Sequence, residues 1–70
     1  PALPVGIHAG TRNPAAWQKY LLARYHASQR DNASVQQSIV LCRDAIALDP
    51  TFAGAYGWLA ISLYYATAEN

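Results

Sequence analysis

The fold class of this chain is decided by residues 45–60, Ala-Ile-Ala-Leu-Asp-Pro-Thr-Phe-Ala-Gly-Ala-Tyr-Gly-Trp-Leu-Ala. Pro50 disfavours helical geometry at the residue before it and has no backbone N–H to donate, so a helix that reaches this point must end near Asp49. The small residues at 53–55 then allow a new helix to approach its neighbour closely. The stretch therefore predicts a helix end, a proline-stopped turn and a second helix start.

The segment before this turn has the clearest helical pattern in the chain. Its apolar residues recur at spacings of four, three and four, as expected for one face of an amphipathic helix: Val35, Ile39, Cys42 and Ile46. Ser34 followed by Gln37 fits a capping box at the start of this helix, and Asn32 is a competing cap. We expect this helix to run to about Leu48.

A further helix is predicted upstream, from about Pro14 to Ser28. Asn13 can accept bonds from the first free backbone amides of a helix, and proline suits the first helical position. Apolar residues follow at helical spacing: Trp17, Tyr20, Leu21 and Ala23, widened by Leu22 and Tyr25. Residues 1–13 contain proline and glycine without helical periodicity, so they are expected to form a linker.

The third predicted helix, about residues 53–67, is apolar on two sides. One predicted face holds Tyr56, Leu59, Ala60 and Leu63, and a nearly opposite face holds Trp58, Ile61 and Tyr65. A helix that is apolar on both sides is normally buried on both sides, and two neighbouring helices can cover only one of them. This pattern predicts that a partner surface lies outside the chain.

The composition supports the same expectation. Only 13% of the residues are charged while 53% are hydrophobic, against about 25% charged in an ordinary soluble domain. The five basic residues are scattered and offset by four acidic ones, so direct nucleic-acid binding is not expected. Residues 50–68 carry no charge, but the glycines, Pro50 and the lack of flanking basic clusters argue against a membrane span.

The turn and the helix after it resemble the junction between two tetratricopeptide repeats. The shared pattern is Ala-x-x-Leu-Asp-Pro at 45–50 followed by Ala-x-Ala-Tyr-x-x-Leu-Ala at 53–60. Cys42 and Ser38 depart from the family's preferred residues, and the turn expected at 29–33 is about three residues longer than the family's usual turn. Residues 13–26 look similar to the opening helix of repeat arrays in some bacterial class III nucleotide cyclases and winged-helix transcription regulators.

The resemblance implies an all-α fold in residues 14–70, with one helical hairpin and the first helix of a second repeat. It also implies a cytoplasmic, non-catalytic module for protein–protein interaction in a bacterial regulatory protein. The alternative is self-association, with two copies pairing Trp58, Ile61 and Tyr65. In either case the partner is a protein or peptide, or a second copy, and the chain is expected to form a homo-oligomer or part of a longer repeat array.

In repeats of this kind the binding groove is lined by the first helix of each pair. The matching positions are Trp17, Tyr20, Leu21 and Arg24 from the first helix, and Gly57, Trp58, Ile61 and Tyr64 from the third. Together with Tyr65 from the self-association contact, eight residues are predicted to bind a partner: Trp17, Tyr20, Leu21, Arg24, Trp58, Ile61, Tyr64 and Tyr65. Aromatic residues dominate this set, which suits an apolar or helical partner. The other interpretation is that the same aromatic residues form the core or the contacts between repeats.

Neither a metal site nor a catalytic site is predicted, and no cofactor is expected. His8, His26 and Cys42 are spaced unlike any zinc motif and a fourth ligand is missing. Cys42 falls on the apolar face of the second helix, where we expect a buried and unreactive thiol. His26 is expected to be partly buried near a helix end.

Overall fold

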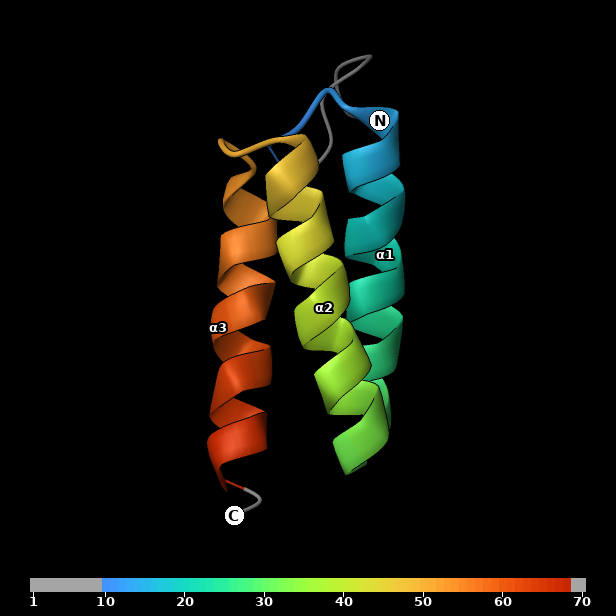
Figure 1. Ribbon diagram of the computed structural model, residues 1–70, viewed down its shortest axis with the longest axis vertical. Helices are drawn as coiled ribbons and strands as arrows, with labels where there is room; N and C mark the ends of the chain where they lie inside the picture. Colours follow the sequence, from blue (N-terminus) through green and yellow to red (C-terminus); the bar gives the residue numbers. More distant parts are fainter. Residues whose placement is uncertain (1–9, 69–70) are drawn as a thin grey trace, which may run out of the picture.

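The computed structural model describes residues 10–68, which form three α-helices: α1 (Pro14–Gln29), α2 (Asn32–Leu48) and α3 (Ala53–Ala68). The helices α1 and α2 form an antiparallel hairpin, and α3 lies along the other side of α2 (Figure 1). The described residues contain no strand, so the predicted all-α fold of a hairpin plus a third helix is confirmed. Among residues 10–68, no helix is both long and apolar enough to cross a bilayer.

The start of α1 is the one predicted from the sequence. The Asn13 side-chain oxygen accepts hydrogen bonds from the backbone N–H groups of Ala15 at 2.9 Å and Ala16 at 3.1 Å, and Pro14 occupies the first helical position. At its other end α1 runs to Gln29, where Arg30 takes a left-handed backbone conformation with φ of 64° and ends the helix.

The start of α2 corrects the sequence prediction. The cap is Asp31, whose carboxylate accepts a hydrogen bond from the Ser34 N–H at 3.0 Å, and the helix begins at Asn32. Neither Ser34 nor Asn32 therefore caps it. An acidic cap is also favoured by the helix dipole. The break between α1 and α2 shrinks to Arg30 and Asp31, so the longer turn expected from the sequence is absent.

The turn between α2 and α3 is held by Asp49. Its carboxylate accepts hydrogen bonds from the Thr11 hydroxyl and from both the N–H and the hydroxyl of Thr51, and its backbone carbonyl accepts from the Phe52 N–H at 3.0 Å. Thr11 is buried, although residues 1–13 were expected to be a linker. Residues 10–13 are thus part of the folded unit, while residues 1–9 lie outside the described part of the chain.

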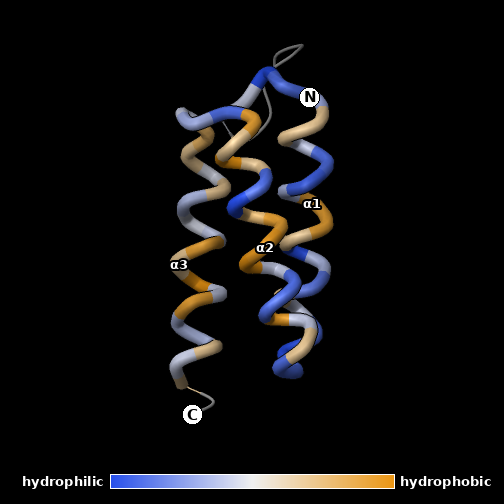
Figure 2. The backbone as a smooth tube through the Cα atoms, viewed as in Figure 1, coloured by the Kyte–Doolittle hydropathy of each residue, from blue (hydrophilic) through white to orange (hydrophobic). Residues whose placement is uncertain are grey.

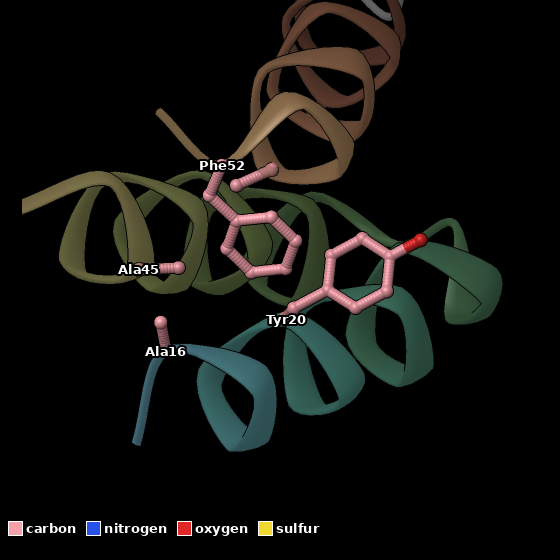
Figure 3. Packing of buried hydrophobic residues seen from close by; sticks show 5 residues of the cluster. Ala16, Tyr20, Ala45 and Phe52 are labelled. Carbon is pink, nitrogen blue, oxygen red and sulfur yellow. The ribbon is translucent and has the colours of Figure 1, made fainter. Parts of the chain in front are cut away.

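The main core lies where all three helices meet near this turn. Phe52 is fully buried, and its ring lies 5.0 Å from the ring of Tyr20 (Figure 3). The surrounding buried residues are small: Ala16, Ala45 and Ala55. A second cluster farther along the hairpin contains Ala23, Leu41 and Cys42. The alanines let the helices approach closely enough for a few large rings to fill the remaining space.

A buried pair of hydroxyl groups links the three helices between the two ends. The Ser38 hydroxyl on α2 donates to the Ala23 carbonyl of α1 at 2.9 Å, and it lies 2.8 Å from the Ser62 hydroxyl of α3. Because Ser38 has one hydroxyl proton and gives it to Ala23, Ser62 is the donor in the second bond. Both serines are fully buried, so these bonds fix how α3 sits on the hairpin.

The packed side of α3 differs from both faces predicted for it. Its buried residues are Ala55 and Ser62, with Trp58, Leu59 and Tyr65 half-buried beside them. The contact line therefore runs between the two predicted apolar faces, because close helix packing selected small residues there rather than large apolar ones. Tyr56, Ala60 and Leu63 are exposed, and so is Ile61.

Candidate functional site

Five of the eight predicted binding residues gather where α1 faces α3. On α1, Trp17 stacks on Tyr20 with their ring centroids 5.2 Å apart. Arg24 lies one turn farther along α1, and its guanidinium carbon is 5.6 Å from the Tyr20 ring centroid and 5.5 Å from that of Trp58 on α3. Arg24 thus bridges α1 and α3 through aromatic rings.

Tyr65, the fifth of these residues, makes a second contact of the same type. The guanidinium carbon of Arg30 lies 4.5 Å from the Tyr65 ring centroid. Trp58 and Tyr65 are seven positions apart on α3, which corresponds to two turns or about 10.5 Å. The junction between α1 and α3 therefore has two cation–aromatic contacts at that spacing. We call the surface formed by Trp17, Arg24, Arg30, Trp58 and Tyr65 the cationic face.

The two guanidinium groups of the cationic face remain available to an anion. Arg24 and Arg30 are exposed, and within residues 10–68 the ion pair is Lys19 with Asp44, at 3.9 Å. Each arginine is positioned by a ring, a contact worth about 0.5–1 kcal/mol at an exposed site. A guanidinium that stacks on a ring keeps its edge N–H groups free for a carboxylate.

The other three predicted residues do not join this arrangement. Leu21, Ile61 and Tyr64 are exposed, with Tyr64 at 69%. Tyr20 is buried against Phe52 and belongs to the core, while Trp58 packs against both core clusters. The core interpretation is therefore confirmed for Tyr20, whereas Arg24 is exposed and Trp17 and Trp58 are half-buried, so a binding role for these three stays a prediction.

Arg30 is the member of the cationic face that the sequence interpretation missed. The sequence places Arg30 in the expected turn at 29–33 and indicates no role for it. Arg30 has a left-handed backbone conformation at the end of α1, and its guanidinium lies over the Tyr65 ring. The available signal was an arginine at the end of the first predicted helix, which packs level with the last turns of the third helix.

The residues weighed for metal binding or catalysis lie apart. Cys42 is fully buried, as predicted, and burial raises the pKa of its thiol, which keeps it protonated and unreactive. His26 is half-buried, also as predicted, and lies edge-on to Tyr25. Across residues 10–68, no three side chains of His, Cys, Asp or Glu come together as metal ligands would. His8 is outside the described residues.

Compared with known proteins, the chain matches no protein-family model, no curated protein and no solved structure. The class that the structure itself defines is an all-α unit of one hairpin and a third helix.

Proposed function

We propose that this chain is a non-catalytic protein-interaction module, and that its cationic face binds an apolar partner segment carrying carboxylates. The observation that carries the proposal is Arg24, held over the rings of Tyr20 and Trp58 with its charge exposed. Aromatic and arginine side chains are the residue types that dominate protein interfaces. The resemblance to tetratricopeptide arrays of bacterial regulatory proteins supports a cytoplasmic signalling or transcriptional context.

The two-turn spacing of Trp58 and Tyr65, the rings that Arg24 and Arg30 contact, suggests the form of the partner. Carboxylates two helical turns apart on a peptide, about 10.5 Å, would face Arg24 and Arg30 together. Apolar residues between them would lie on the half-buried rings of Trp58 and Tyr65. An amphipathic helix with acidic residues at i and i+7 meets both requirements.

The test is a fluorescence titration, because both tryptophans of the chain, Trp17 and Trp58, belong to the cationic face. The titrant is a designed helical peptide with Leu between two Glu residues at i and i+7, and the control peptide has Gln at both positions. We expect the Glu peptide to bind at least about tenfold more tightly, the ratio that corresponds to one charge-assisted contact.

The matched protein variants are Arg24→Gln and Arg43→Gln. Both arginines are exposed on helices, but Arg43 lies on α2 and does not belong to the cationic face. Arg24→Gln should remove the preference for the Glu peptide, and Arg43→Gln should keep it. The proposal is wrong if neither peptide binds to the folded chain, or if Arg24→Gln leaves the preference unchanged.

A further inference from the structure

The side of α3 that points away from α1 and α2 is a separate surface from the cationic face. Its residues are all exposed and none is charged, and we call them the outer face: Ala53, Tyr56, Gly57, Ala60, Leu63 and Tyr64. Figure 2 shows the contrast with α1 and α2, whose tubes carry strongly hydrophilic stretches that α3 lacks. The large side chains remain substantially accessible, with Tyr56 at 47%, Leu63 at 40% and Tyr64 at 69% exposed.

Gly57 on the outer face has no explanation among residues 10–68. A glycine inside a helix costs about 1 kcal/mol relative to alanine. Its backbone is not in the left-handed region, and a Cβ placed on it would meet nothing within 4 Å. Gly10 is the contrast, because its φ of 102° requires glycine. The missing side chain at Gly57 therefore leaves space that only a surface from outside the described residues can use.

The large and small residues of the outer face are ordered so that the face can pack against a second copy of itself running in the opposite direction. If two α3 helices pack antiparallel with the two-fold axis at Ala60, residues equally distant from position 60 meet. Leu63 then faces Gly57 of the other copy, and the space above each glycine receives a leucine. Tyr64 meets Tyr56, and the two Ala60 residues meet on the axis, where small side chains allow close approach. Positions three and four residues away lie on the same side of a helix, so all these contacts form together.

We propose that two copies of this chain pair through the outer faces of α3, antiparallel and centred on Ala60. The residue order of the outer face selects a second copy as the occupant, because Leu63 and Gly57 complement each other across the axis, and the pairing buries no unpaired charge. The four large exposed side chains, including Ile61 beside the face, present on the order of 400 Å² per copy. With the small residues between them, a pair reaches the roughly 1,000 Å² at which stable interfaces begin. Because this area lies at the lower end of the range for stable interfaces, the dimer is expected to be reversible.

The pairing leaves the cationic face open. Arg24 and Arg30 contact the other side of α3, at Trp58 and Tyr65. The inference therefore does not depend on the proposed function, and either can fail without the other.

The experiment is sedimentation equilibrium of the full chain over a concentration series, with variants at the predicted axis. Ala60→Arg places two arginines against each other in the pair and should weaken dimerisation at least tenfold at low salt. Ala60→Glu should do the same by itself. Mixing the two variants should restore the dimer, because opposite charges then meet at the axis. This rescue can occur only if both variants are folded and position 60 of one copy faces position 60 of the other.

The matched control is Val40→Arg, which adds the same charge at an exposed apolar position of α2, 50% exposed in the structure. It should dimerise as the unmodified chain does. A folded chain that stays monomeric throughout the series would overturn the proposal and assign the outer face to a different partner. A dimer that persists in Ala60→Arg, or a mixture that shows no rescue, would also overturn it.

Discussion

Replacing the buried hydroxyls of Ser38 and Ser62 tests how α3 is attached to the hairpin. Ser62→Ala removes one hydrogen bond and leaves Ser38 bonded to the Ala23 carbonyl, so it should cost about 1 kcal/mol. Ser38→Ala removes both bonds and leaves the Ser62 hydroxyl buried without its acceptor, so it should cost about 2–3 kcal/mol.

The double variant separates this explanation from simple loss of packing. Once Ser38 is alanine, changing Ser62 as well removes a buried hydroxyl that has lost its acceptor, so the double variant should cost no more than Ser38→Ala alone. The two single costs should therefore exceed the cost of the double variant by at least about 1 kcal/mol. Urea unfolding followed by far-UV circular dichroism measures all three variants. Costs that add to within about 0.3 kcal/mol would show that the two hydroxyls are not coupled, and would refute the reasoning.

Three other perturbations have expected outcomes. Asn13→Ala should lower stability by about 1 kcal/mol in urea unfolding by removing the α1 cap, while Asn13→Asp, which keeps the acceptor, should be much milder. Phe52→Ala should lower the free energy of unfolding by about 3–5 kcal/mol and broaden or abolish the thermal transition. If Leu22→Ala, at an exposed position, lowered the free energy of unfolding as much, a core at Phe52 would be contradicted. Hydrogen bonds from Thr11, and to a smaller extent from Thr51, lower the pKa of Asp49 below 3.8. Its contribution to stability is therefore present above pH 3.8 and is lost as the pH falls through the lowered pKa. Asp49→Asn should flatten the dependence of stability on acid pH, and an unchanged stability profile would contradict the assignment.

The sequence was sufficient for the helices and for one of the two caps. Asn13-Pro14 has one sensible interpretation, and Pro50 sets the end of α2 by covalent geometry alone. The start of α2 was harder, because Asp31, Asn32 and Ser34 are all good caps within four positions. A cap at Asp31 makes α2 almost one turn longer than a cap at Ser34 would. Cap propensities do not take account of the helix length that each cap allows.

The faces of α3 were harder still, for a physical reason. Apolar residues surround this helix, so hydrophobic periodicity gives no direction. The packed line was set by small size at Ala55 and by a hydrogen bond at Ser62, and neither property appears in a count of large apolar residues. The cationic face was half predicted, since Arg24 followed from its helical position while Arg30 depended on a left-handed backbone that sequence does not reveal.

Because α3 is anchored less firmly than the α1–α2 hairpin, we expect it to open before the hairpin unfolds. The α1–α2 hairpin is closed by the short turn at one end and by Thr11, Asn13 and Asp49 at the other, whereas beyond the Phe52 turn α3 buries little more than Ala55 and Ser62 completely. Amide hydrogens of α3 should therefore exchange with solvent through a partial opening that leaves the hairpin intact. A ligand on either side of α3 would oppose that opening, so slower exchange in α3 alone would report occupancy of either face.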